Sequence, residues 1–252
     1  MSVGIFGCRT APLTGSRWHG ERRENISTHT VVVDAGHGGH DPGASRHSLK
    51  EKVLALDIAT RLRHELEDSG VQVVMTRQID HFIPLSNRPA IANRLRADLF
   101  VSVHLNANER LWVSGAEVYY PRESVVGPSA PWPPSVKPTE VARDNLSVKP
   151  ILWDLVLGYE RQQAQRLSSS ICTALHQDLQ VECVTKPARF VVLREALMPA
   201  VLVEVGYMSN PQEAGRLSQE GYRETAAYAI AQGILDYLNE EASQNRARDS
   251  RP

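Results

Sequence analysis

The sequence of 252 residues has little cysteine, no excess of charge of either sign and no long apolar run. Its 28 basic and 29 acidic side chains give a formal net charge of -1, so the chain as a whole has no general attraction for nucleic acid or an anionic membrane. No segment approaches the roughly 18 consecutive apolar residues that a membrane-spanning helix needs. The sequence therefore predicts no membrane span and no nucleic-acid partner, and its function has to be inferred from a local site.

The cysteines Cys8, Cys172 and Cys183 have the spacing of neither a zinc knuckle nor a disulfide framework. A bridge between Cys172 and Cys183 would require an oxidising compartment, and the sequence leaves a bridge and two separate thiols as alternatives.

Hydrophobic residues make up 42% of the chain, enough for a sizeable core in a single domain. Residues 1–28 have no hydrophobic periodicity and are expected to form a disordered leader, without the apolar segment of a secretory signal. We expect the folded domain over residues 29–240 and a polar, frayed tail over 241–252.

Strand and helix patterns alternate along this domain. Apolar residues recur every four positions in 49–68, which predicts an amphipathic helix, and apolar runs such as 99–103 predict buried strands. The pattern indicates an α/β fold, with a mixed, mostly parallel central sheet flanked by helices on both faces. Strands are expected near 31–34, 71–75, 98–105, 115–120, 190–193 and 200–205, and helices over 49–68, 87–96, 151–179 and 222–238.

The segment 121–150 differs in character, because it holds seven of the fifteen prolines, which disfavour a helix or a central strand. It is too long for a simple connection, so we interpret it as an inserted loop.

A glycine-rich turn follows the first apolar strand, in the stretch Asp34-Ala35-Gly36-His37-Gly38-Gly39. The glycines allow a sharp turn that places His37 beyond the carboxyl end of a strand, where α/β proteins bind ligands. The alternative is a tight turn in which His37 only caps the strand.

Two further side chains fall at element ends that a parallel sheet would bring to the same rim. Glu51 starts the first helix, and His104 ends the strand near 98–105. For Glu51 the alternative is a capping box with Ser48, and for His104 it is a hydrogen-bonded strand end. Two imidazoles and a carboxylate are a sound set of zinc ligands that leaves a fourth position open, which is typical of a catalytic site.

Glu204 lies near the end of the apolar strand at 200–205, where a carboxylate is costly to bury without a partner or a task. We interpret Glu204 as a general base that takes a proton from water. The alternative is a salt bridge to an arginine such as Arg77 or Arg88.

Several motifs, spread over roughly residues 30 to 240, resemble those of the zinc-dependent N-acetylmuramoyl-L-alanine amidases of the AmiC type. They are Asp34 to Gly39, Glu51-Lys52, Thr76-Arg77 with Asp80, Leu85 and Arg88, Ala92-Asn93, Ala97 to Ala107, and Met198 to Asn210. The resemblance implies that His37, Glu51 and His104 bind Zn²⁺ and that Glu204 is the catalytic glutamate. It also implies the substrate, the peptidoglycan amide between N-acetylmuramic acid and L-alanine, in cell-wall remodelling or daughter-cell separation. Residues 29–240 would then be the amidase catalytic domain.

The resemblance also bears on residues around this set. Asn106 is a candidate for hydrogen bonding to substrate, with strand capping as the alternative, and Arg77, Arg88 and Asn93 are expected to be structural. In some amidases of this type a helix inserted at 121–150 covers the zinc until an activator protein removes it. Glu140 is the candidate blocking group here, and a solvated loop is the alternative that the prolines favour.

Two other hypotheses stay open at this stage: a catalytically dead wall-binding module, and a zinc peptidase or deacetylase with another substrate. A peptidoglycan substrate implies a periplasmic, cell-envelope or secreted protein, although residues 1–25 contain no convincing export signal. We expect a monomer.

Overall fold

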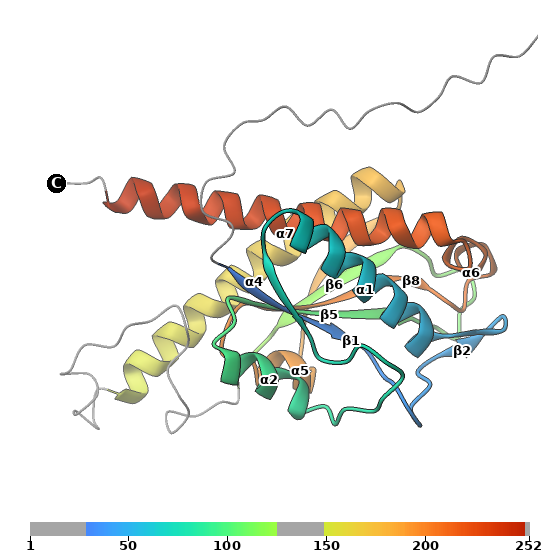
Figure 1. The fold of residues 1–252 in the computed structure, drawn as a ribbon, viewed down its shortest axis with the longest axis horizontal. Helices are drawn as coiled ribbons and strands as arrows, with labels where there is room; N and C mark the ends of the chain where they lie inside the picture. Colours follow the sequence, from blue (N-terminus) through green and yellow to red (C-terminus); the bar gives the residue numbers. More distant parts are fainter. Residues whose placement is uncertain (1–28, 125–148, 250–252) are drawn as a thin grey trace, which may run out of the picture.

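A six-stranded sheet lies at the centre of the fold in this computed structural model, which describes residues 29–124 and 149–249 (Figure 1). Its strand order is β4-β1-β5-β8-β6-β7. The first four of these strands are mutually parallel, β6 runs antiparallel to β8, and β7 runs parallel to β6. The predicted mixed, mostly parallel sheet is therefore confirmed. The strands are β1 (Thr30–Ala35), β4 (Gln72–Met75), β5 (Leu99–Asn106), β6 (Ala116–Pro121), β7 (Cys183–Ala188) and β8 (Ala200–Tyr207), with a separate small pair of β2 (Ser45–Arg46) and β3 (Leu49–Lys50).

Helices cover both faces of the sheet. One face packs against α1 (Glu51–Asp68), α4 (Lys149–Leu179) and α7 (Glu220–Asp249) in the larger apolar core. The opposite face packs against α2 (Asn87–Leu95), α5 (Val191–Arg194) and the first turns of α4 in a smaller core. A short helix, α6 (Pro211–Leu217), follows β8. Figure 1 shows α1 and α7 on one side of the strands and α2 and α5 on the other.

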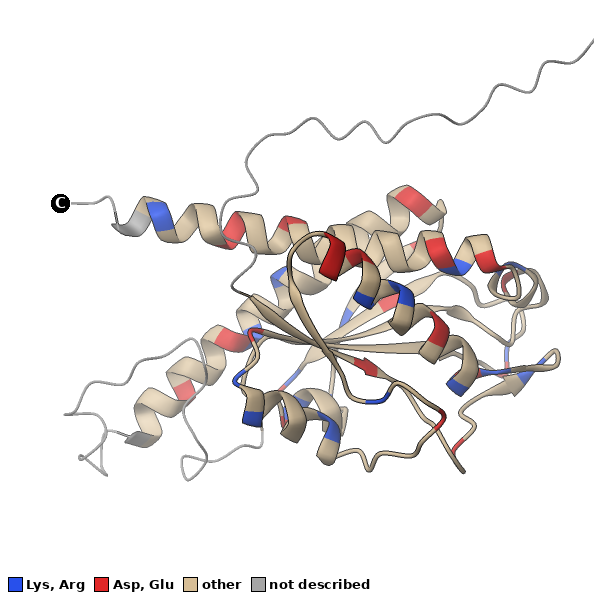
Figure 2. Cartoon of the chain, viewed as in Figure 1, with Lys and Arg blue, Asp and Glu red and all other residues tan. Residues whose placement is uncertain are grey.

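The central strands β5 and β8 are apolar on both faces because each face is covered. In β5, Phe100 contributes to the smaller core and Val101 to the larger one, and both side chains are fully buried. This is the near-continuous apolar pattern of a parallel strand between two helical layers. The strands carry few charged residues, whereas acidic and basic residues are both spread along the outer helices (Figure 2).

The expected strand at 190–193 is wrong. This segment is the one-turn helix α5, and its apolar residues Val192 and Leu193 are buried against the smaller core. A four-residue apolar run has no periodicity that separates helix from strand. The strand β7, at one edge of the sheet, was not predicted, because Lys186 and Pro187 interrupt its apolar pattern. Proline is tolerated in an edge strand.

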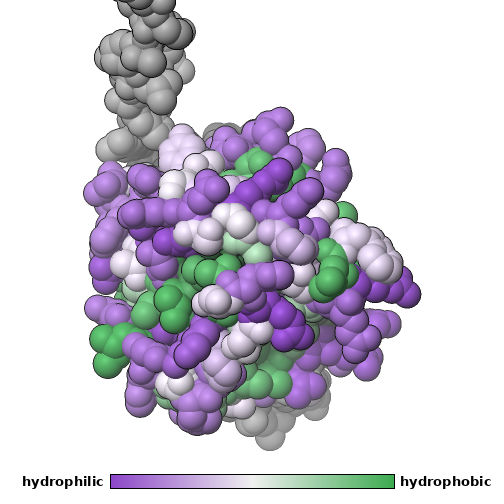
Figure 3. Space-filling model, turned by 90° about the vertical axis from the view of Figure 1, so that its right-hand side faces the viewer, coloured by the Kyte–Doolittle hydropathy of each residue, from purple (hydrophilic) through white to green (hydrophobic). Residues whose placement is uncertain are grey.

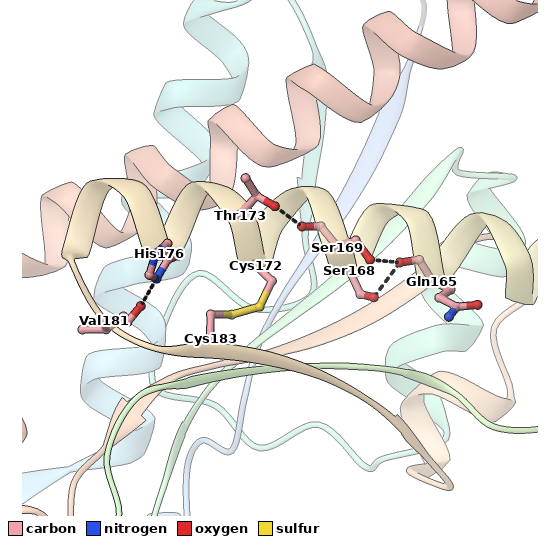
Figure 4. Close-up of a disulfide and its surroundings, with 8 residues drawn as sticks. All are labelled: Gln165, Ser168, Ser169, Cys172, Thr173, His176, Val181 and Cys183. Atoms are coloured by element: carbon pink, nitrogen blue, oxygen red, sulfur yellow. Dashed lines mark hydrogen bonds between the residues drawn. A yellow bond between two sulfur atoms is a disulfide. The ribbon is translucent and has the colours of Figure 1, made fainter.

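A disulfide joins Cys172 in α4 to Cys183 at the start of β7 (Figure 4). Of the two alternatives that the sequence left open, the structure therefore has the bridge. It links the C-terminal part of the long helix α4 to the edge strand β7, and the two cysteines are 11 positions apart in the sequence.

The final helix is longer than the pattern of 222–238 predicted. It continues to Asp249, through most of the segment expected to be frayed. Among the helices of the described ranges, none combines the length and the apolar character needed to cross a bilayer. The candidate blocking residue Glu140 lies outside the described residues.

Candidate metal centre

The loop after β1 holds His37 in a constrained conformation. The backbone of His37 has a φ of 58°, which is uncommon for a residue other than glycine. Next to it, Gly38 has a φ of 123°, and a Cβ there would lie 2.2 Å from the carbonyl oxygen of His81. Only glycine fits at that position, so the glycine-rich turn is a requirement of the loop.

Two arginines fix this loop through its carbonyl groups. Arg88 Nη2 donates to the carbonyl of His37 at 2.8 Å, and Arg77 Nη2 donates to that of Gly36 at 2.7 Å. Arg88 is itself held by an ion pair of 3.0 Å with the fully buried Asp34. Because both arginines are committed to this loop, the alternative that one of them pairs with Glu204 is wrong.

The carboxylate of Glu51 lies between the two imidazoles. Its Oε1 is 3.0 Å from His37 Nε2 and 2.8 Å from His104 Nδ1. Burial alone would raise the pKa of Glu51, but the hydrogen bonds from His104 and His37 outweigh it and hold that pKa well below its usual range. The capping-box alternative is wrong, because Lys50 is the N-cap of α1 and the Glu51 side chain instead accepts from the backbone amide of Ala44 at 2.8 Å.

His37, Glu51 and His104 therefore form one cluster. Each offers one ligand atom, these atoms all lie within 4.8 Å of one another, and the imidazoles meet edge to face with their centroids 4.9 Å apart. Two imidazole nitrogens and a carboxylate oxygen suit a catalytic zinc ion. The arrangement can hold a metal ion, as the sequence predicted.

Asp41 orients the first of these imidazoles and was not assigned a role from the sequence. Its Oδ2 lies 2.8 Å from His37 Nδ1, which leaves Nε2 to face Glu51. A carboxylate on the far nitrogen of a metal-binding histidine fixes the ring and raises its basicity. The spacing of four residues within the glycine loop was the signal available for this role.

Glu204 lies beside the cluster, because β8 pairs with β5 so that Glu204 is the neighbour of His104. Its Oε2 is buried and has no hydrogen-bond partner among the residues that the structure describes. Burial raises the pKa of Glu204 to about 7, with the charges of Glu51 and Glu117 acting in the same direction and that of His104 against it. A carboxylate with such a pKa can both accept and release a proton near neutral pH.

A second buried carboxylate, Glu117 on β6, lies directly opposite Glu204 in the antiparallel pairing. It accepts hydrogen bonds from Lys186 Nζ at 2.5 Å, from Tyr207 Oη at 2.9 Å and from the hydroxyl of Tyr119. Glu117 was not assigned a role from the sequence, although a charged residue between the apolar residues of a short strand was a signal.

Asn106 is engaged on both sides of its amide. Its Nδ2 donates to Glu117 Oε2 at 3.3 Å, and its Oδ1 accepts from the backbone amide of Ala107 at 2.8 Å. These contacts are those of the capping alternative, and a substrate contact of Asn106 stays a prediction.

A cavity of about 730 Å³ opens onto the cluster. The metal-binding candidates and Glu204 line one part of it, and Phe190, Val192 and Leu202 form an apolar wall elsewhere. The face of the molecule toward which β1 points has apolar patches set among hydrophilic side chains (Figure 3). The remaining lining residues are Asp41, Ala44, Phe82, Leu85, Arg88, Leu105, Asn106, Ala107, Arg189 and Val191.

The fold and the cluster together define an α/β protein with a candidate hydrolytic metal centre at the carboxyl rim of its parallel strands. Residues 31–236 match the family described as N-acetylmuramoyl-L-alanine amidase (Amidase_3), and the chain belongs to that family.

Named relatives agree with this assignment. The N-acetylmuramoyl-L-alanine amidase AmiA of Escherichia coli is 33% identical over 227 residues, which are 83% of this chain and 76% of that protein. Among solved structures, AmiC2 of Nostoc punctiforme is 35% identical with a TM-score of 0.66, over 84% of this chain and 98% of that one. The CwlD amidase from Clostridioides difficile, solved in complex with the GerS lipoprotein, is 30% identical with a TM-score of 0.64, over 84% and 98% of the two chains.

Proposed function

We propose that this protein is a zinc-dependent hydrolase that cleaves the amide bond between N-acetylmuramic acid and L-alanine in peptidoglycan. The observation that carries the proposal is the pairing of the His37, Glu51 and His104 cluster with the buried, unpartnered Oε2 of Glu204. Family membership and the named relatives support this substrate.

The three ligand candidates fit zinc by their chemistry. They supply two imidazole nitrogens and one carboxylate oxygen, the number of protein ligands that catalytic zinc sites use. Such an ion, when bound, polarises a carbonyl oxygen and lowers the pKa of a water molecule. Asp41 holds His37 in the orientation that binding needs, and the carbonyl contacts of Arg77 and Arg88 keep the loop in place.

In this proposal Glu204 acts as the general base and then as the general acid. Its free Oε2 accepts a proton from the water that attacks the amide carbon and returns it to the nitrogen of L-alanine as the C–N bond breaks. The pKa of about 7 that burial gives Glu204 suits both halves of this cycle, and a cation bound at the cluster will lower that value. A catalytically inactive wall-binding module would not require a buried carboxylate without a hydrogen-bond partner beside three metal-ligand candidates.

The substrate places the working protein outside the cytoplasmic membrane. The Cys172–Cys183 disulfide supports this location, since such bonds persist in oxidising compartments. Control by an activator protein acting on residues 121–150, with Glu140 as a blocking group, stays a prediction; a related amidase, CwlD, has been solved with a lipoprotein partner.

Product analysis tests this proposal. Purified peptidoglycan is incubated with chelator-treated protein, with and without added zinc, and the soluble products are identified by mass. The proposal expects zinc-dependent release of peptides with a free L-alanine amino terminus. Loss of acetyl groups, or cuts within the peptide, would favour a deacetylase or a peptidase instead.

A further inference from the structure

We propose that Arg189 is a specificity-determining residue that binds a carboxylate on the peptide arm of the substrate. The inference rests on the proposed function and extends it to the recognition of the leaving peptide.

Of the described residues, two with cationic side chains line the cavity around the cluster, and they differ in how far they are committed to other partners. Arg88 is 2% exposed and is committed to Asp34 and to loop carbonyls. The side chain of Arg189 is 61% exposed, and its ion-pair partner among the described residues is Glu123 at 3.0 Å, which is itself 39% exposed. Ion pairs of this exposed kind contribute little to stability, so a substrate carboxylate can replace Glu123 at little cost.

Other lysines near the sheet are already engaged. Lys186 Nζ lies 2.5 Å from Glu117 Oε1, and Lys52 Nζ donates to the Gly39 carbonyl at 2.7 Å and to Asp80 at 2.6 Å. Neither lysine lines the cavity. Arg189 is therefore the cation that the cavity offers to a ligand within the described part of the chain.

Arg189 lies on the wall of the cavity and outside the metal cluster. It precedes Phe190, whose ring packs against Tyr119 with centroids 5.1 Å apart, and Tyr119 lies opposite Leu202 in the β6–β8 register. Arg189 and Phe190 line the same cavity as Leu202 and Glu204, so a peptide stem that leaves the site along this wall passes the Arg189 guanidinium.

The chemistry of the two substrate arms decides which one carries the charge. N-acetylmuramic acid joined through its lactyl amide has no ionised group, whereas a peptide presents carboxylates. A guanidinium binds a carboxylate through two parallel hydrogen bonds, and the apolar wall of Phe190, Val192 and Leu202 packs against the aliphatic part of the stem.

Binding to a variant that does not turn over tests this inference separately from catalysis. Calorimetry on zinc-loaded Glu204→Gln protein compares two probes, muramoyl-L-alanylglutamate and its diamide. We expect the diacid to bind about tenfold more tightly, and we expect Arg189→Gln in the same background to remove this preference without weakening the diamide.

Three further variants sharpen the comparison. Arg189→Lys should retain part of the preference, Glu123→Gln should retain or increase it, and Arg46→Gln, an exposed arginine outside the cavity, should leave it unchanged. A preference that survives Arg189→Gln, equal binding of both probes to the parent, or equal weakening of both by Arg189→Gln would overturn the inference. The amidase proposal itself is decided by turnover of the wild-type protein, so the two can fail independently.

Discussion

Glu204 and Glu117 lie directly opposite each other on β8 and β6, and their carboxylates have contrasting surroundings. Glu117 accepts from a lysine, two tyrosines and an asparagine, whereas Glu204 Oε2 has no hydrogen-bond partner within 29–124 and 149–249. Burial would raise the pKa of Glu117, but the hydrogen bonds from Lys186, Tyr119 and Tyr207 lower it. One carboxylate is thus kept ionised by its partners, whereas burial raises the pKa of the other.

Replacing Glu117 by glutamine should destabilise the fold. Lys186 loses its ionic partner and two tyrosine hydroxyls lose a charged acceptor, so we expect the free energy of unfolding to fall by about 1–3 kcal/mol. Chemical denaturation measures this change, with Glu182→Gln, an exposed position just before β7, as the matched control. Equal stability of the two variants would show that the Glu117 contacts contribute nothing.

Replacing Asp41 by asparagine should weaken metal binding while leaving the fold intact. His37 loses the carboxylate that fixes its ring through Nδ1, and partners of this kind change metal affinity by roughly 10–100-fold. Competition with a chromogenic chelator measures the zinc affinity, and Asp68→Asn at the exposed end of α1 is the control. An unchanged affinity in Asp41→Asn would contradict the orienting role.

Removing the disulfide should cost stability and spare the site. A bridge across 11 positions contributes about 2–3 kcal/mol by restricting the unfolded chain, so the double variant Cys172→Ser, Cys183→Ser should unfold earlier by that amount. Neither cysteine lines the cavity around the metal cluster, so zinc content and turnover should stay at the wild-type level. If the variant instead lost its zinc, the edge strand β7 would have to support the cluster directly.

Acid should weaken the contact between α1 and α7. Burial would raise the pKa of Asp57, but hydrogen bonds from Arg223, at 2.6 Å, and from Arg61 outweigh it and lower that pKa below its ordinary 3.8. The group therefore stabilises the fold fully above pH 3.8, and this contribution, about 0.5–1 kcal/mol, is lost as the pH falls through the lower value of the folded protein.

The comparison that checks this effect is the stability of wild type and Asp57→Asn measured from pH 6 down to about pH 2. The difference between the two proteins should shrink in acid. A constant difference over the whole range would mean that the ionisation of Asp57 does not contribute.

The sequence predicted the site better than the edges of the fold. His37, Glu51, His104 and Glu204 were singled out because each lies near the start or end of a strongly patterned element. Parallel strands bring such ends to one rim, where the structure brings these side chains together. The central strands were predicted because burial on both faces makes their sequences continuously apolar.

The elements that were missed have weak local signals. The helix α5 is a single turn, and β7 carries a lysine and a proline that only an edge strand tolerates. The partners Asp41 and Glu117 act through contacts with other side chains, which depend on tertiary structure. That Arg189 is exposed and lines the cavity also depends on tertiary structure.

Zinc content and turnover, determined together for wild type, His104→Ala and Glu204→Gln, test the proposed metal ligands and base at once. We expect one zinc per chain in wild type and in Glu204→Gln, loss of zinc in His104→Ala, and at least about 10²-fold slower release of L-alanine amino termini by Glu204→Gln. Full turnover by Glu204→Gln, or a His104→Ala protein that keeps its zinc, would contradict the roles of Glu204 as base and His104 as ligand.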